Sequence, residues 1–294
     1  MHLVNCGNVQ CESNFAKWVL DIGNGNVATH VFSDDIALPV HMLLEGNSVQ
    51  SMVNFIYANL SCIDNFADFF QERAILAPRN KDVDVINSLA LGKLDGASKE
   101  YRSADSITSL DDRAQQLYTL EFLNNLDLGG GFPPHVLILK ENAPIILLRN
   151  LDPRRGLCNG TRLICKQMYE RVIEAEIITG KNAKDIVFIP RIDFNSPSSL
   201  GLPFEMKRMQ FPIKLAFGMT INTAQGQTLE NLGLYLSSPV FSHGQLHVAM
   251  SRVRSSNAIK VVVDDRKLER QQGTTEVYAR IPNVVYKGVL QLAH

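Results

Sequence analysis

The sequence has no hydrophobic run of the roughly 20 residues that a membrane-spanning helix needs. Its first residues, MHLVNCGNVQ, lack a basic flank followed by an apolar core, so a secretory signal is not predicted. An excess of one charge is also missing, because 29 Lys and Arg residues face 30 Asp and Glu residues. No global field draws the molecule to nucleic acid, and only local basic spots are left for that role.

Paired cysteines are missing as well. The five cysteines include no Cys-x-x-Cys pair and have no histidines at zinc-finger spacing. This pattern excludes a zinc finger and favours buried thiols in a reducing compartment. The remaining composition, 45% hydrophobic and 20% charged over 294 residues, is typical of a globular protein with one large domain or two modest ones.

The phosphate-binding loop of nucleotide hydrolases is a further absence. No Gly-x-x-x-x-Gly-Lys-Ser/Thr segment occurs: GNGNVATH lacks the lysine, and ITGKNAK lacks the first glycine and the hydroxyl. These residues therefore offer no amide cradle for a triphosphate. The sequence that precedes residue 220 also lacks an apolar strand that ends in an Asp-Glu pair, which a magnesium site of this class of enzyme requires.

The first part of the chain has the residue pattern of an α/β protein. Apolar residues at helical spacing predict helices over 12–22 and 49–60. The apolar run 74–77 predicts a short buried strand that Pro78 ends, and Asn80 is a candidate cap for a helix that follows up to Leu94. Strand, loop and helix in this order form the basic unit of an α/β sheet.

The texture changes at GGGFPPH (129–135), where glycines and prolines indicate a boundary. Short β-rich segments follow at close spacing, which is typical of a small barrel or sheet. We expect strands over 136–139, 144–148, 161–165, 172–178 and 185–189, and the loop 194–203 closes this section.

The α/β texture then returns. Strands are predicted over 211–219, 232–237 and 258–263, with a helix over 242–253 between the last two. The apolar stripe of that helix leaves Arg252 off its buried face. The predicted layout is an α/β domain interrupted by a β insertion.

Two polar segments carry candidate chemistry. TINTAQGQT follows a buried strand and offers neutral hydrogen-bonding groups suited to a phosphodiester backbone, while Gly226 permits close approach. AMSRVR places Arg252 on a helix, where a cation suits the γ-phosphate of a nucleotide. Taken singly, each segment is better explained by the simpler interpretation, a polar turn for the first and a surface salt bridge for Arg252. The neutral groups are those of Thr220, Asn222, Thr223, Gln225 and Thr228.

In their order, however, these segments resemble the C-terminal half of the Pif-family (petite integration frequency) DNA helicases, in the branch found in Helitron-type transposons and in plant and insect genomes. MTINTAQGQTLENLGLYL resembles motif V of that family, and GQLHVAMSRVRS resembles motif VI. GLCNGTRL (156–163) is similar to the turn of its inserted barrel domain 2B. RAILAPRNKDVDVIN, FAKWVLDIGNG and NVVYKGVL also resemble this branch.

The resemblance implies a second RecA-like motor domain, 2A, over 1–134 and 203–294, with the small β-barrel 2B inserted over 135–202. It implies ATP-driven, 5′-to-3′ DNA unwinding with Mg²⁺, in partnership with single-stranded DNA and with a first RecA-like domain that these residues do not contain. It further implies roles in repair, recombination and telomere maintenance, and nuclear residence with mitochondrial residence as the alternative.

The resemblance also implies roles for individual residues. Arg252 would be the catalytic arginine finger on the γ-phosphate, with Gly226 and Gln227 near the nucleotide. The implied DNA contacts are Pro78, Arg79, Asn80, Thr220, Asn222, Gln225 and His247.

The chain departs from the family pattern at several positions. Thr223 and Ala224 stand where motif V commonly has Lys-Ser, and loss of that lysine weakens phosphate attraction. Because the phosphate-binding loop is missing, these residues alone are predicted not to turn over ATP. Two readings therefore stay open: the motor half of a helicase, or a transposon-derived remnant that acts as a DNA-binding or interaction module.

Overall fold

The computed structural model describes residues 6–27, 34–46, 48–108, 118–126, 128–129, 131–196, 201–263, 268–270 and 277–286. Contacts divide the chain into two compact units. Unit 1 comprises residues 1–59, 72–90 and 218–294, and unit 2 comprises residues 60–71 and 91–217. No helix in the described ranges is long and apolar enough to cross a membrane.

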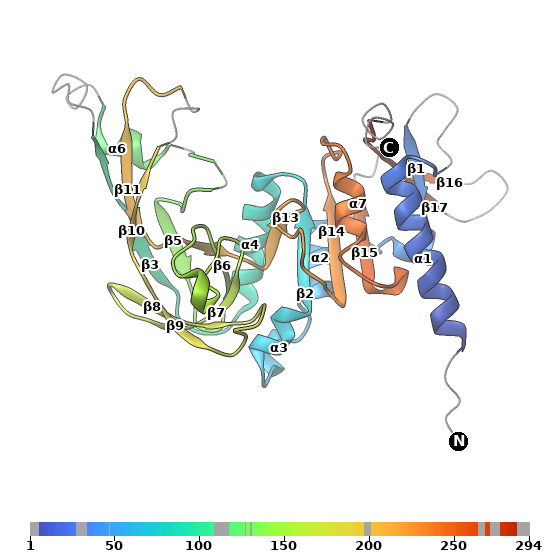
Figure 1. The fold of residues 1–294 in the computed structure, drawn as a ribbon, viewed down its shortest axis with the longest axis horizontal. Helices are drawn as coiled ribbons and strands as arrows, with labels where there is room; N and C mark the ends of the chain where they lie inside the picture. The colour runs from blue at the N-terminus through green and yellow to red at the C-terminus, as the bar shows by residue number, and fades with distance from the viewer. Residues whose placement is uncertain are drawn as a thin grey trace. The chain divides into compact units, whose positions relative to one another are not determined.

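Unit 1 is built on a four-stranded, all-parallel sheet (Figure 1). Its strands are apolar almost throughout, as expected where both faces of a parallel sheet are covered. Ile75, Leu234 and Val261, one from each of three adjacent strands, are almost completely buried. In spatial order the strands are β13 (Gly218–Thr220), β2 (Arg73–Ala77), β14 (Asn231–Leu236) and β15 (Ile259–Val263).

Helices alternate with these strands along the chain, which confirms the predicted α/β class. The N-terminal helix extends well beyond the predicted range 12–22, and it lies beside α7 (Figure 1). The predicted helix over 49–60 ends early, because Tyr57 leaves the helical conformation as its C-cap. The helices of unit 1 are α1 (Cys6–Asn24), α2 (Val49–Ile56), α4 (Asn80–Lys93, which runs into unit 2) and α7 (Gln245–Met250), with 3₁₀ turns η1 (Val40–Met42) and η5 (Ser256–Ala258).

A second, antiparallel sheet completes unit 1. It pairs strands from the two ends of the chain, in the order β1-β17-β16. Ile36 of its first strand and Ile281 of its central strand are register partners, and both are buried. The strands are β1 (Asp35–Leu38), β16 (Leu268–Arg270) and β17 (Val277–Pro282).

Strand β13 is held in the parallel sheet by a side chain of helix α4. The Asn87 amide donates to the Gly218 carbonyl at 3.3 Å and accepts from the Gly218 N–H at 2.8 Å, so it pairs with this residue as a neighbouring strand would. Glycine is required there, because a Cβ atom would lie 2.7 Å from Ile86 Cγ2. The single strand predicted over 211–219 is therefore wrong. The segment forms two strands in different units, and Gly218 begins the second.

Unit 2 contains mostly antiparallel β structure, in sheets of five, three and two strands. The predicted strands at 136–139, 144–148, 161–165, 172–178 and 185–189 all occur here with small shifts. The five-stranded sheet has the order β12-β6-β7-β8-β9, and the others pair β10-β11-β4 and β3-β5. The described pairings leave these sheets open, and a closed barrel is not among them.

The elements of unit 2 are short. Its strands are β3 (Lys99–Arg102), β4 (Ala104–Ile107), β5 (Val136–Leu139), β6 (Pro144–Leu147), β7 (Arg162–Met168), β8 (Val172–Ile177), β9 (Ile186–Pro190), β10 (Ile192–Asn195), β11 (Met206–Gln210) and β12 (Ile213–Leu215). Its helical elements are α3 (Phe66–Gln71), α6 (Leu120–Asn124), η2 (Leu60–Cys62) and η3 (Pro153–Arg155).

Unit 2 extends beyond the predicted insertion 135–202 in both directions. Upstream, β3 pairs with β5 and β4 pairs with β11. Downstream, β12 pairs with β6. One apolar cluster joins these segments, and it includes Tyr101, Leu147 and Phe211. Long-range strand pairing thus adds residues on both sides of the predicted range to the same compact unit.

Gly233 in strand β14 tests the packing of unit 1. A Cβ atom on this residue would lie 2.5 Å from Met52 Sδ and 3.0 Å from Ile56 Cγ1, and Met52 is completely buried. Gly233→Ala is therefore expected to lower the free energy of unfolding by about 1–3 kcal/mol, the usual cost of overpacking a core.

The measurement is chemical denaturation followed by circular dichroism. Gly92→Ala on α4 is the matched control, because nothing lies within 4 Å of a Cβ atom added there. That exposed helical site is expected to be neutral or slightly stabilised. Equal stability of the Gly233 variant and the wild type would contradict the packing described here.

Candidate nucleotide and nucleic-acid site

The predicted DNA-contact loops meet at the carboxyl ends of strands β2 and β13. Thr220 and Ala77 are register partners in the parallel pair, and the Ile221 N–H donates to the Ala77 carbonyl at 3.1 Å. Residues 78–80 follow β2 directly, so they lie beside the first residues of the 220–227 turn. Pro78 is buried, whereas Arg79 and Asn80 are exposed. The structure therefore brings two separate predicted segments together.

Backbone hydrogen bonds order the turn after β13. The Ala224 N–H donates to the Thr220 carbonyl at 3.2 Å, and the Gln225 N–H donates to the Asn222 carbonyl at 3.3 Å. The hydroxyls of Thr220 and Thr223 lie 2.7 Å apart. Asn222 and Gln225 are exposed on this fixed backbone. Their amides are thus presented to solvent at the carboxyl edge of the sheet, where α/β folds commonly bind ligands.

Arg252 lies just beyond helix α7 and points at the same turn. The helix is shorter than predicted, because Ser251 is already its C-cap. The Arg252 guanidinium donates to the carbonyls of Ala224 at 3.4 Å and Gln227 at 3.0 Å. Its Nε donates to the Val248 carbonyl at 2.9 Å, and Nη2 donates to Ser251 Oγ at 2.9 Å. Four of its five N–H groups are therefore occupied.

The surroundings of Arg252 affect its charge. The residue is half-buried, and this burial lowers the pKa of the guanidinium from its ordinary value. The shift does not neutralise the side chain, because arginine stays protonated in proteins. A desolvated, fixed cation of this kind interacts more strongly with an anion than a fully hydrated one does.

The three predicted nucleotide contacts lie together. Gly226 takes a left-handed conformation (φ +84°) that turns the chain toward Gln227. The Gln227 carbonyl accepts from Arg252, and its buried side-chain Oε1 has no partner among the described residues. The Leu229 N–H donates to the Arg252 carbonyl just before β14 begins. This group therefore lies toward the amino end of β14, whereas Thr220 lies at the carboxyl end of the parallel strand β13.

These residues fit only part of a nucleotide site. They offer one cation and one spare acceptor, but no run of backbone N–H groups for the phosphates. ATP and Mg²⁺ would therefore need most of their contacts from other residues. Chemically, this arrangement can contribute positive charge to a triphosphate.

His247 is engaged elsewhere in unit 1. Its Nδ1 lies 2.8 Å from the Val19 carbonyl, and because a carbonyl only accepts, Nδ1 carries the proton. The ring also covers Gly23, where a Cβ atom would lie 2.7 Å from Nδ1. The imidazole thus packs between α7 and α1, and the structure does not bring it to the predicted DNA loops.

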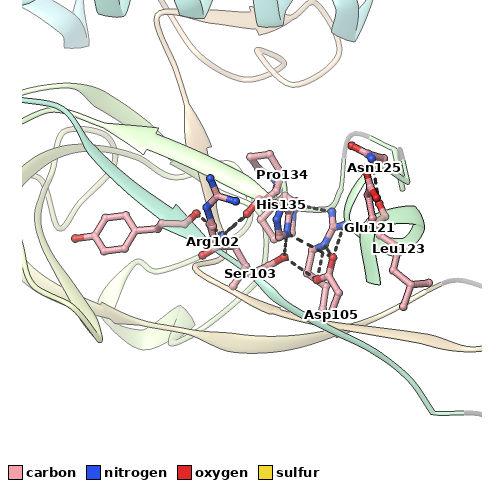
Figure 2. Close-up of polar contacts among 12 residues, drawn as sticks. Arg102, Ser103, Asp105, Glu121, Leu123, Asn125, Pro134 and His135 are labelled. Carbon is pink, nitrogen blue, oxygen red and sulfur yellow. Dashed lines mark hydrogen bonds and ion pairs between the residues drawn. The ribbon is translucent and has the colours of Figure 1, made fainter. Parts of the chain in front are cut away.

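Sequence reasoning missed a buried polar cluster in unit 2 (Figure 2). Arg208 of β11 donates to both carboxylate oxygens of Asp105, at 2.8–3.2 Å, and also to the carbonyls of Pro133 and Leu123. Both side chains are almost fully buried. A buried pair of this kind is stable only with such extra hydrogen bonds. No local sequence signal marks Arg208, because its partner is 103 residues away in the chain.

Ser103 and His135 extend this cluster, so three residue types of a hydrolase triad meet. The Ser103 hydroxyl donates to Asp105 at 2.7 Å and lies 2.7 Å from His135 Nδ1 (Figure 2). The carboxylate lies 3.7 Å from the same nitrogen. In a catalytic triad the two imidazole nitrogens face the serine and the acid separately. Here one nitrogen faces both, so the cluster is a structural network.

Comparisons with known proteins agree with this architecture. The family model described as the 2B domain of DNA helicase Pif1 matches residues 121–168, within unit 2. The ATP-dependent DNA helicase PIF1 of Danio rerio is 29% identical over 70% of this chain and 30% of its own length. That of Emericella nidulans is 26% identical over 90% of this chain and 41% of its own length. The chain thus spans less than half of these curated relatives.

Solved structures show the same fold. The Pif1 helicase from Candida albicans aligns with a TM-score of 0.58 and 19% identity, covering 96% of this chain and 57% of that one. A Bacteroides Pif1 helicase in complex with ADP-AlF3 and single-stranded DNA aligns with a TM-score of 0.56 and 17% identity, covering 95% of this chain and 52% of that one.

The parallel sheet, with its polar loops, therefore has the α/β fold of these solved helicases. In sequence, the chain is similar to the Pif-family ATP-dependent DNA helicases. The family resemblance that its motifs indicated is confirmed.

Protonation of His135 gives a test of the buried cluster. Its pKa lies below the ordinary value of 6.5, mainly because burial disfavours the charged ring; Asp105 opposes this shift and Arg208 adds to it. The unfolded chain therefore takes up this proton at a higher pH than the folded chain does. Unfolding free energy is expected to fall as the pH drops through 6.5, until the folded pKa is passed.

The measurement compares the wild type with His135→Gln, whose side-chain amide can still donate to Ser103. Urea midpoints are recorded from about pH 7.5 to about pH 5.5. The variant is expected to lose less stability over this interval. Parallel pH profiles of the two proteins would show that His135 does not titrate as the cluster geometry implies.

Proposed function

We propose that this chain is the second motor region of a Pif-like, 5′-to-3′ ATP-dependent DNA helicase. In this proposal unit 1 corresponds to domain 2A, and the greater part of unit 2 corresponds to domain 2B. Single-stranded DNA binds at the carboxyl edge of the parallel sheet, and Arg252 reaches a nucleotide that a first motor domain holds. The relatives named PIF1 are ATP-dependent DNA helicases, and one structural neighbour carries ADP-AlF3 and single-stranded DNA.

The observation that carries the proposal is the hydrogen bond between Ile221 and Ala77. It joins the two loops that the family resemblance independently assigns to DNA contact. Asn80, at the start of α4, and Asn222, in the turn, are both exposed, and Arg79 beside Asn80 supplies a charge. Neutral amides with one cation suit a backbone-tracking contact that moves along a strand without reading its sequence.

The second supporting feature is the link between Arg252 and the same turn. Its guanidinium bonds to the carbonyls of Ala224 and Gln227, while the turn begins at Thr220 in the DNA-contact loops. If Arg252 moves to meet a γ-phosphate, the two carbonyls lose their donor and the turn loses two hydrogen bonds. One short segment thus connects nucleotide binding to contact with the DNA strand.

ATP turnover tests this proposal. The chain alone is expected to show no hydrolysis, with or without single-stranded DNA, because it lacks a phosphate-binding loop. Joined to a first motor domain that contains one, it is expected to hydrolyse ATP in response to DNA. Arg252→Lys is then expected to lower kcat by about a thousandfold or more, the usual range for an arginine finger.

The matched control is Arg254→Lys, two residues away on an exposed side chain. It is expected to leave kcat unchanged, and thermal midpoints check that both variants fold. ATP hydrolysis by the chain alone that Arg252→Ala abolishes would contradict the expectation that hydrolysis needs a first motor domain. Full turnover of the joined protein with Arg252→Lys would overturn the role of this arginine.

A further inference from the structure

Two turns of unit 2 display exposed cations that the proposed function does not use. Arg154 and Arg155 lie in η3, and Lys181 and Lys184 lie in the turn between β8 and β9. All four side chains are exposed, and none forms an ion pair with a carboxylate in the described part of the chain. We name residues 153–156 and 180–185 the basic turns.

The basic turns lie at the same end of the strands of the five-stranded sheet. Strands β6, β7, β8 and β9 are adjacent and antiparallel, so the β6–β7 and β8–β9 connections emerge on one side (Figure 1). The turns are in contact, because a Cβ atom on Gly156 would lie 3.0 Å from Asn182 Oδ1. Arg155 and Lys181 adjoin these two contacting residues in the chain. The four cations therefore lie on two turns that are in contact.

Hydrogen bonds fix the backbone of the first basic turn. Asp152 Oδ1 accepts from the Arg154 N–H at 3.1 Å, and the Leu157 N–H donates to the Asp152 carbonyl at 2.9 Å. Thr161 Oγ1 donates to the Gly156 carbonyl at 2.8 Å. Gly156 itself is left-handed, with φ +76°. The two arginines thus extend from a backbone that needs no reordering to bind.

The second basic turn is also fixed. The Lys184 N–H donates to the Ile177 carbonyl at 2.7 Å, which holds this lysine in a left-handed conformation with φ +78°. Glycine or asparagine adopts that conformation more readily than lysine does. Two acids lie in this region, and both accept from neutral donors: Asp152 caps η3, and Asp185 accepts from the Asn182 amide at 3.4 Å. Residues 152–156 and 180–185 therefore contain four cations and two carboxylates.

We propose that the basic turns form a binding site for the phosphodiester backbone of nucleic acid, separate from the loops at the parallel sheet. Arginine recognises phosphate through paired N–H groups, and lysine adds point charge. Two cation pairs on neighbouring turns match a ligand whose charges repeat. Residues 153–156 and 180–185 expose no large apolar side chain that could insert into a lipid surface, so a membrane fits this patch less well.

The experiment measures binding of fluorescent single-stranded and duplex oligonucleotides to the chain by anisotropy, over a series of salt concentrations. The test variants are Arg154→Gln/Arg155→Gln and Lys181→Gln/Lys184→Gln. The matched control, Arg102→Gln/Lys207→Gln, removes two cations of unit 2 that already pair with Glu100 and Asp193. Circular dichroism and thermal midpoints check the folding of every variant.

Each phosphate contact adds about 0.7 to the slope of log affinity against log salt for single strands. Either test variant is therefore expected to reduce the size of that slope by up to about 1.4, whereas the control keeps the wild-type slope. Slopes equal to the control in both test variants would overturn the site, as would a wild-type chain that binds neither oligonucleotide.

A further variant separates this inference from the proposed function. Asn80→Ala/Asn222→Ala changes the loops at the parallel sheet and leaves the basic turns intact. If only this variant weakens binding, the basic turns are refuted and the motor-domain site stands. If only the basic-turn variants weaken binding, the reverse holds. Additive losses support two separate contacts on one strand.

Discussion

The pairing of strand β13 with β2 is the constraint on which the candidate site depends. The strand has only three residues, and two supports keep it in place. The Asn87 amide occupies both hydrogen-bonding groups of Gly218, and the absence of a side chain on that glycine lets Ile86 pack against the backbone. Without this pairing, the turn that follows would not lie beside the loop after β2.

The turn then links two ends of the parallel sheet. It begins at Thr220, beside the loop that follows β2, and returns to the start of β14, where Arg252 donates to its carbonyls. A half-buried guanidinium is costly unless its N–H groups are satisfied, and here two carbonyls of the turn accept from it together with Val248 and Ser251 of the helical segment. The bonds to the turn therefore make the position of this cation sensitive to the conformation of the turn.

Much of unit 1 could be predicted from the sequence, because its signals are local. The apolar run 74–77, the proline after it and the periodic helix that follows are sufficient to identify a βα unit. The ordered motifs around Gln225 and Arg252 were sufficient for the family. His247 was less predictable: its position on a helix next to the predicted site gave no indication that its ring packs on α1.

Unit 2 was harder to predict, because its pairings join distant segments. Strands β3 and β4 are rich in charged and polar residues, and neither has the apolar alternation of a core strand. Strand β11 places Arg208 and Gln210 inside, against the usual pattern. Arg208 is buried because it pairs with Asp105, and Gln210 is buried because it donates to the carbonyls of Tyr101 and His135. Neither partner can be identified before the folded structure is known. Residues 211–219 are divided between two units for the same reason, because β12 pairs with β6 and β13 pairs with β2.

The most direct measurement is photo-crosslinking of the chain to single-stranded DNA that carries 4-thiothymidine, followed by mass spectrometry of the crosslinked peptides. Crosslinks are predicted in two peptides of unit 1, one spanning residues 78–80 and one spanning residues 220–225. Saturable binding with no crosslink in either peptide would contradict the claim that this edge of the parallel sheet contacts DNA.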